Sequence, residues 1–294
     1  MNRRKAELAL VCNAVIWGTT FVLVKSALHV VSPVLFLAIR FSVATLALMV
    51  LFRGRWKLRR KVTVKMLAAG CLTGVFLFTG FLLQTLGLQL TTPPKSAFLT
   101  GLSTVMVPLL AALVYRIRPQ VSEVLGVLVA TAGMGLMTLA GPIGSIGRGD
   151  LLTFGCAVAF AAHIVTLGHF SEQVGYELLS ITQVGAAAMS ALSLLWWVET
   201  PHIQWQPIVL WAIVITGLLA TALAFTIQAW AQHYTTSTRT ALIYALEPVV
   251  AWMTSFFIAG QGLSGRGAAG AALILSGVLL VEMKPFHPRK HLLD

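Results

Sequence analysis

Residues 84–99, QTLGLQLTTPPKSAFL, match residues 228–243, QAWAQHYTTSTRTALI, at a constant offset of 144 positions (228 minus 84). The offset aligns amides with amides, hydroxyls with hydroxyls and a lysine with an arginine. The aligned residues are Gln84 with Gln228, Thr91 with Thr235, Thr92 with Thr236, Lys95 with Arg239, Ser96 with Thr240 and Ala97 with Ala241. The same offset aligns Gly126 with Gly270 and Gly133 with Gly277. Recurrence at one fixed spacing indicates that the chain consists of two related halves.

The composition of the chain places both halves in a membrane. Hydrophobic residues make up 57% of the 294 positions and charged residues only 10%, and the mean hydropathy is +0.86. A soluble fold of this composition would have almost no polar surface to present to water. A bilayer removes that difficulty, because a transmembrane helix needs about 20 mainly apolar residues.

The apolar segments are numerous enough for ten such helices. They lack the strict alternation of apolar and polar residues that a transmembrane strand requires. The predicted spans cover residues 6–27, 33–52, 66–88, 96–115, 121–140, 150–169, 178–198, 207–231, 238–259 and 266–283. The first run is too long for a signal peptide, so we expect a retained helix. The predicted fold class is an all-α integral membrane protein with ten transmembrane helices.

The basic residues are distributed unequally between the two sides of the predicted membrane. With the N-terminus inside, most of the 21 Lys and Arg residues fall on the cytoplasmic side, as the positive-inside rule requires. The exceptions are Lys25, Lys95, Arg148 and Arg266, which fall outside, and Arg40, which lies within a span. We therefore attribute the net charge of +12 to topology and to contact with anionic lipid, and we expect no nucleic-acid partner.

Five spans in each half are an odd number, so the second half must enter the membrane in the opposite orientation to the first. The predicted units are a first repeat at 6–140, a second repeat at 150–283 and a cytoplasmic tail at 284–294. A Gly-rich loop at 141–149 joins the repeats. Inverted repeats of this kind open a central site first to one side of the membrane and then to the other. Both termini are expected in the cytoplasm.

Five motifs, in order along the chain, resemble one family of membrane proteins. They are WGTTFVLVK at 17–25, IRF at 39–41, GDL at 149–151, ALIYALEPVVA at 241–251 and GAALILSGVLL at 270–280. With them the chain is similar, over almost its whole length, to the EamA-like family of the drug/metabolite transporter superfamily. It departs from the family at Arg116 and Gln261, where many members carry an acidic residue, and in a loop after the sixth span that lacks basic residues.

The resemblance implies several properties of the chain. They are ten helices, both termini inside, a bacterial inner membrane, and a cavity lined mainly by the first, third, fourth, sixth, eighth and ninth spans. The implied activity is transport, usually export, of amino acids or other small metabolites.

Glu247 is the only acidic residue in the middle of a predicted span. A charge in hydrocarbon is costly and rarely faces lipid. Its neighbour Pro248 lacks an N–H, which interrupts the helix and leaves a carbonyl free. We interpret Glu247 as a proton carrier or as the counter-charge of a substrate amine. The alternative is a structural carboxylate, bonded to a helix end or paired with Arg40 or Arg239.

Polar residues at helical spacing occur in both halves. One set is Thr240, Tyr244 and Glu247, and the other, at the offset of 144, is Ser96, Thr100 and Ser103. Spacings of four and three residues put each set on one face of its helix. Both faces are predicted to line a pathway between the halves.

Three further polar residues lie deep in spans. Gln84 and Gln228 are repeat equivalents and would offer a donor and an acceptor each to a zwitterion, or alternatively join helices through amide hydrogen bonds. His163, the only histidine in the middle of a span, would bind substrate or relay a proton. Its alternative is a satisfied packing residue.

Deep aromatic residues complete the candidate site. Trp17 and Trp230 would stack on an apolar or aromatic substrate, as would Phe160, with ordinary core packing as the alternative. Thr20 shares a face of the first span with Trp17. Arg40 could make a bidentate contact with a substrate carboxylate, but we favour snorkelling or an ion pair for it.

No enzymatic motif is present: the chain has no phosphate-binding Gly-Lys-Ser/Thr loop, no zinc-protease helix and no serine nucleophile elbow. The three cysteines share no metal spacing, and no cofactor is expected. We predict a secondary transporter of small metabolites, an exporter of amino acids or related amines that works by alternating access. The alternatives are a channel or a lipid-handling protein of the same fold. The expected partners are a small-molecule substrate and the lipid bilayer, with the chain as a monomer or homodimer.

Overall fold

The computed structural model of the chain describes residues 3–54, 62–91, 93–116, 119–138, 147–259 and 265–282. Within these ranges the backbone is helical apart from short connections and one isolated antiparallel bridge between Val31 and Ile203. The predicted tail at 284–294, most of the predicted linker at 141–149, and Gln261 lie outside the described residues.

Each predicted span corresponds to one helix or to consecutive helical segments. The single helices are α1 (Arg3–Ala27), α2 (Pro33–Phe52), α3 (Val64–Leu90), α6 (Val121–Thr138), α7 (Arg148–Ser171), α8 (Tyr176–Val198) and α13 (Gly265–Glu282). The segmented ones are α4 (Pro93–Gly101) with α5 (Ser103–Tyr115), α9 (Pro207–Val214) with η2 (Ile215–Leu223) and α10 (Ala224–Ala231), and α11 (Ser237–Tyr244) with α12 (Glu247–Ala259).

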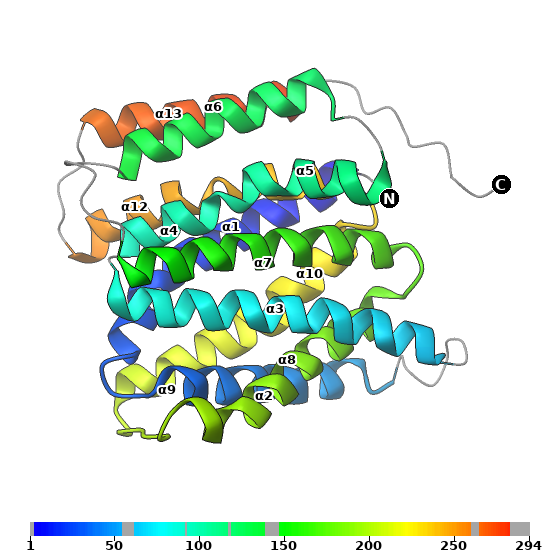
Figure 1. Cartoon of the computed structure of the whole chain (residues 1–294), viewed down its shortest axis with the longest axis vertical. Helices are drawn as coiled ribbons and strands as arrows, with labels where there is room; N and C mark the ends of the chain where they lie inside the picture. Colours follow the sequence, from blue (N-terminus) through cyan, green and yellow to red (C-terminus); the bar gives the residue numbers. More distant parts are fainter. Residues whose placement is uncertain are drawn as a thin grey trace.

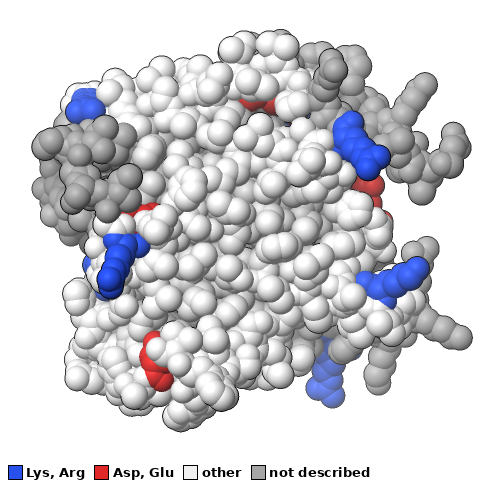
Figure 2. Space-filling model, in the orientation of Figure 1, with Lys and Arg blue, Asp and Glu red and all other residues white. Residues whose placement is uncertain are grey.

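Seven stretches of helix in the described part of the chain are long and apolar enough to cross a membrane. Two shorter apolar helices, at Val121–Leu136 and Gly265–Val281, accompany them. On the face drawn in Figure 2, the Lys and Arg side chains lie toward the two ends of the helices, with a broad uncharged area between them. Side chains such as Leu113 and Phe257, each 75% exposed, suit a surface covered by lipid. The chain is thus an all-helical, multi-pass membrane protein.

The helices run side by side in layers (Figure 1). At one edge α6 packs against α13, and at the other α2 packs against α8. Between them α3 packs against α7 and α8, while α1 contacts η2 and α10 on one side and α11 and α12 on the other. Helix α1 therefore lies in the interior, between segments of the C-terminal half.

Glycines let α6 and α13 approach each other closely. A Cβ atom at Gly126 would lie 2.8 Å from the carbonyl oxygen of Gly277, and one at Gly133 would lie 2.6 Å from that of Gly270. The earlier glycine of α6 thus faces the later glycine of α13, so the two helices are antiparallel. Small residues at such crossings allow backbones to touch, which is how helices associate in lipid.

The span predicted at 238–259 is divided, because the backbone breaks at Ala245 and Leu246 between α11 and α12. The amide of Leu246 donates to the carbonyl of Ile243 at 3.1 Å, a contact one residue shorter than the α-helical one. Pro248 explains the break, since its ring cannot donate and crowds the carbonyl four residues earlier. The predicted common face of Tyr244 and Glu247 is therefore divided between two helical segments.

The span predicted at 96–115 is interrupted as well. Its break falls at Leu102, between α4 and α5, and the Leu102 amide donates to Leu99 at 3.2 Å. Gly101 precedes the break and favours it, because glycine weakens a helix interior. Thr100 and Ser103 consequently belong to different segments.

Candidate functional site

A central cavity lies among the helices of both halves. It contains about 80 Å³ of space that the centre of a water molecule can reach, and its wall is mainly apolar with convergent polar groups, as is usual for small-molecule sites. The polar and aromatic residues of the wall are Trp17, Thr20, Phe21, Arg40, Phe81, Gln84, Thr85, Thr100, Ser103, Thr104, Phe160, His163, Phe225, Gln228, Tyr244 and Glu247.

Most residues predicted for the site lie on this wall, but Ser96, Trp230 and Thr240 do not. Ser96 is completely buried in α4 away from the cavity wall, and its Oγ has no hydrogen-bond partner in the described structure. Trp230 packs against Tyr234 with ring centroids 5.6 Å apart, outside the cavity. The residues that do line it keep their binding role as a prediction.

Trp17 fixes the side of the cavity formed by α1. Its indole Nε1 donates to the carbonyl oxygen of Ala220 at 2.8 Å. The ring lies 5.3 Å from that of Phe225 and 4.8 Å from that of Tyr244, measured between centroids. Thr20, one turn further along α1, uses its hydroxyl to bond the carbonyl of Trp17 at 2.8 Å. The indole is therefore held by one hydrogen bond and two ring contacts where it lines the cavity.

The two glutamines make different local contacts. Gln84 donates through Nε2 to the hydroxyl of Thr100 at 3.2 Å, and Gln228 donates through Nε2 to Oε1 of Gln232 at 3.2 Å. The Oε1 atom of Gln228 is buried and has no hydrogen-bond partner in the described part of the chain. An unpaired buried acceptor costs about 1–3 kcal/mol, so Gln228 offers a free acceptor to a ligand.

His163 of α7 is 1% exposed, and its Nε2 lies 2.9 Å from Oε1 of Gln183 on α8. The imidazole also packs edge-on against Phe225, with centroids 5.5 Å apart. One ring nitrogen is thus already bonded within the protein. This contact is the packing role weighed as the alternative, although the ring still borders the cavity.

Glu247 begins α12 and is half-buried at the cavity wall. Its carboxylate makes no hydrogen bond or ion pair with any residue that the structure describes. Neither basic partner considered from the sequence contacts it: Arg239 pairs with Glu7, and Arg40 bonds to η2. Its backbone carbonyl lies beside Gly18, where an added Cβ would come within 2.8 Å. The acid is therefore packed against α1 and left free for a ligand or a proton.

The favoured interpretation of Arg40 is wrong, because its side chain neither snorkels to a membrane surface nor pairs with a described acid. The residue is 4% exposed. Its Nε donates to the hydroxyl of Thr221 at 2.7 Å and its Nη2 approaches the carbonyl of Ala220 at 3.4 Å. The guanidinium carbon lies 4.3 Å from the ring centroid of Phe81, a cation–π distance.

The partners of Arg40 come from a π-helical stretch that the sequence did not reveal. A π-helix has more residues per turn than an α-helix, and η2 is wound in this way. Within it the Thr221 hydroxyl donates to the carbonyl of Thr216, five residues earlier, at 2.7 Å. The carbonyl of Ala220 accepts from both Trp17 and Arg40. π-Helical segments within α-helices recur at functional sites.

Phe81 and Phe225, which the sequence did not predict for the site, also line the cavity wall. Their rings meet edge to face with centroids 5.9 Å apart. The repeat itself carried the signal, because these two phenylalanines are separated by the same offset (225 minus 81 is 144).

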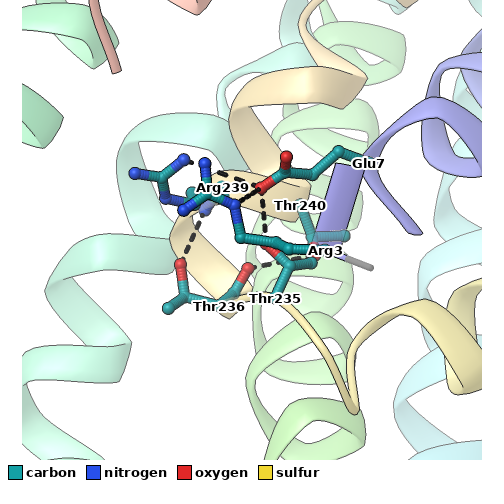
Figure 3. A network of polar contacts seen from close by, with 6 residues as sticks. All are labelled: Arg3, Glu7, Thr235, Thr236, Arg239 and Thr240. Carbon is teal, nitrogen blue, oxygen red and sulfur yellow. Dashed lines mark hydrogen bonds and ion pairs between the residues drawn. The ribbon is translucent and has the colours of Figure 1, made fainter. Parts of the chain in front are cut away.

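A polar network, termed here the Glu7 network, joins the beginning of α1 to the beginning of α11 (Figure 3). Oε1 of Glu7 lies 2.8 Å from Nε of Arg3 and 3.6 Å from Nη1 of Arg239, and accepts from the Thr235 hydroxyl at 3.3 Å. Glu7 and Arg239 are both buried. Trp17 is ten residues further along α1, so the network lies about 15 Å from the cavity along the helix axis.

A second network, the Asp150 network, joins the end of α3 to the beginning of α7. Thr91 donates from its hydroxyl to Oδ1 of Asp150 at 2.9 Å, and the amide of Gly147 donates to Oδ2 at 2.9 Å. Lys25, at the end of α1, bonds to the last carbonyls of α3, among them that of Leu88. The ammonium thereby satisfies acceptors that a helix C-terminus leaves open.

The residues described in the structure contain no group of three or more His, Cys, Asp or Glu side chains that would hold a metal ion. The groups on the cavity wall include one free carboxylate, one buried guanidinium, one imidazole, side-chain amides, hydroxyls and aromatic rings.

Residues 4–139 and residues 147–283 each match the EamA-like transporter family. The chain belongs to this family. An uncharacterized transporter of Archaeoglobus fulgidus is 33% identical to it over 285 residues, covering 97% of this chain and 88% of the relative. The uncharacterized transporter YvbV of Bacillus subtilis is 26% identical over 292 residues, covering 97% and 93%. A crystal structure at 23% identity shares the fold with a TM-score of 0.76, covering 95% of this chain and 97% of the other.

Membership of the EamA-like family, part of the drug/metabolite transporter superfamily, establishes the chain as a membrane transporter. A transporter is generally not an enzyme.

Proposed function

We propose that the chain is a secondary transporter that moves small metabolites by alternating access, exporting amino acids or related amines. The observation that carries this proposal is the free carboxylate of Glu247 on the wall of an otherwise apolar cavity. An acid without a partner inside a membrane marks a substrate or ion pathway. A substrate ammonium would pair with it, and the open Oε1 of Gln228 would accept a further N–H.

An arrangement of ten helices as two inverted repeats is the second part of the proposal. The cavity wall supports it, because Phe81, Gln84, Thr100 and Ser103 stand at the offset of 144 from other wall residues, namely Phe225, Gln228, Tyr244 and Glu247. The helix breaks agree, since Leu102 and Leu246 are separated by the same offset. The antiparallel glycine contacts of α6 and α13 also map onto one another when the halves are exchanged.

Alternating access gains support from the Glu7 and Asp150 networks. Thr91 and Thr235 are repeat equivalents, and each donates to an acid at the beginning of another helix. In the predicted topology the Glu7 network is on the cytoplasmic side and the Asp150 network on the outer side. Each would close one end of the pathway, as a carrier with two gates requires. The membrane is proposed to be a bacterial inner membrane, with both termini in the cytoplasm.

Reconstitution into liposomes tests this function and separates it from its rivals. A carrier gives saturable counterflow of a labelled amino acid or amine, and the full-length protein is expected to do so. Ohmic current without saturation would identify a channel, and transfer of labelled phospholipid between leaflets would identify a lipid-handling protein. Either result, in place of counterflow, would overturn the proposal.

A further inference from the structure

Two charged residues on the cavity wall come from different sides of α1. Glu247 begins α12, beside Gly18 of α1. Arg40 belongs to α2 and reaches the Ala220 carbonyl, which the indole of Trp17 also reaches. In Figure 1, α12 and α2 lie on opposite sides of the molecule's interior, and α1 contacts both α12 and η2. The indole of Trp17 thus reaches the same carbonyl as Arg40, while the next residue of α1, Gly18, packs against the backbone of Glu247.

The guanidinium of Arg40 retains unused hydrogen-bonding capacity. It has five N–H donors, and the structure gives it two contacts, one to the hydroxyl of Thr221 and one to the carbonyl of Ala220. No carboxylate among the described residues pairs with it. A buried cation that keeps free donors is costly unless an anion joins it.

The orientation of this guanidinium is fixed before any ligand arrives. The ring of Phe81 lies under one face, 4.3 Å from the central carbon, and the bond from Nε to Thr221 at 2.7 Å sets the rotation in that plane. Arginine held in this way presents a planar fork that matches the two oxygens of a carboxylate. A structural brace for η2 would need only the contacts already made.

We propose that Arg40, held by Thr221 and Phe81, is the carboxylate subsite of the cavity, so that the substrate is a zwitterion whose carboxylate binds Arg40 while its ammonium faces Glu247. This inference rests on the proposed function and narrows it, since it selects amino acids over their decarboxylated amines. The apolar and aromatic wall between the two charges, with Trp17, Phe160 and Phe225, accommodates the substrate side chain.

The experiment compares matched pairs of solutes with purified full-length protein in liposomes. The probes are the standard amino acids and the amines formed by removing the carboxyl group from each, tested as competitors and as labelled substrates in counterflow. For the best amino acid, the matched amine is expected to bind about tenfold or more weakly, since charge-assisted hydrogen bonds to one group are worth that much. Arg40→Gln should weaken binding of the amino acid by about the same factor and change binding of the amine by less than about threefold. The preference for the amino acid should therefore disappear.

Two variants distinguish carboxylate binding from a structural role. Arg40→Lys keeps the charge and loses the fork, so the amino acid should bind with intermediate affinity. Thr221→Val removes the hydroxyl that anchors Nε and keeps the guanidinium, so the preference for the amino acid should shrink but persist. If Arg40 only stabilised η2, Arg40→Gln and Thr221→Val would weaken the binding of the amino acid and of its amine equally.

The outcomes separate failure of the inference from failure of the proposed function. Saturable counterflow of amines with no preference for amino acids would leave a carrier and overturn the carboxylate subsite. An unchanged preference in Arg40→Gln, with the protein folded by its thermal transition, would overturn it as well. No saturable counterflow with any probe would overturn both.

Discussion

The hydroxyl of Thr91 donates a hydrogen bond of 2.9 Å to the carboxylate of Asp150. Its repeat equivalent Thr235 donates to a different acid, Glu7, at 3.3 Å. One threonine lies at the end of α3 and the other shortly before α11, and each acid belongs to the first two turns of its helix. The two halves thus each contain one threonine-to-carboxylate hydrogen bond. In inverted repeats these two hydrogen bonds would lie at opposite ends of the pathway.

Weakening either contact should open the corresponding end. Glu7→Gln loses the ion pairs with Arg3 and Arg239, and Asp150→Asn loses a charged acceptor of Thr91. Each change is worth about 1 kcal/mol or more, which shifts an equilibrium severalfold. A cysteine in place of Ser103 on the cavity wall, in a background without Cys12, Cys71 and Cys156, reports access to a membrane-impermeant maleimide.

The labelling rate should rise from the cytoplasmic face in Glu7→Gln and from the outer face in Asp150→Asn. Sealed vesicles of known orientation give the two rates separately. An increase from the same face in both variants would show that the networks do not serve opposite ends.

Glu247 should couple transport to protons if its free carboxylate takes one up during the cycle. Glu247→Gln removes the charge and nearly preserves the shape. Counterflow of substrate should persist with weaker binding, because glutamine no longer offers a charge to the ammonium, while accumulation driven by an imposed pH gradient should fall to the level without a gradient. Measuring both in the same liposomes provides the internal control, and a variant that retains gradient-driven accumulation would exclude Glu247 as the proton carrier.

The sequence predicted the membrane class and many of the polar residues on the cavity wall, because both depend on patterns along the chain. Apolar length locates spans, and the offset of 144 brought Gln84 and Gln228 to one site. The break at Ala245 was only half visible: Pro248 gave the signal, but a helix can continue past a proline when tertiary contacts allow it.

The surroundings of Arg40 could not be predicted. A π-helical stretch depends on hydrogen bonds that other helices make to its backbone. Here the carbonyl oxygen of Ala220 accepts from Nε1 of Trp17 at 2.8 Å and from Nη2 of Arg40 at 3.4 Å. Neither contact has a sequence pattern, because α1, α2 and η2 meet only in the folded chain. The general rule that arginines in membrane helices snorkel to the surface therefore failed for Arg40, which is buried between helices.

The crossing of α6 and α13 should tolerate no side chain at Gly277. A Cβ atom there would lie 2.6 Å from the carbonyl oxygen of Gly126, so Gly277→Ala forces the backbones apart. Overpacking of this kind costs about 1–3 kcal/mol and should lower the thermal unfolding midpoint of the purified protein. Gly265→Ala is the matched control on the same helix, since a Cβ there meets nothing within 4 Å. Equal midpoints for the two variants would contradict the close approach.

Trp17→Phe separates the hydrogen bond of the indole from its packing. Phenylalanine keeps an aromatic ring against Phe225 and Tyr244, whose centroids lie 5.3 and 4.8 Å away. It removes the donor that reaches the Ala220 carbonyl at 2.8 Å and leaves that acceptor with the longer contact to Arg40. The expected loss of stability is about 0.5–1.5 kcal/mol, the usual net value of one hydrogen bond.

The same substitution should loosen the part of η2 that holds Arg40. Hydrogen exchange of the η2 backbone is therefore expected to increase in Trp17→Phe, together with a lower thermal midpoint. Trp211→Phe on α9 is the control, because that side chain is 62% exposed and should change neither quantity. If Trp17→Phe matches the Trp211→Phe control in both measurements, the indole contributes packing alone, and the geometry of η2 is maintained by Arg40 and Thr221 without it.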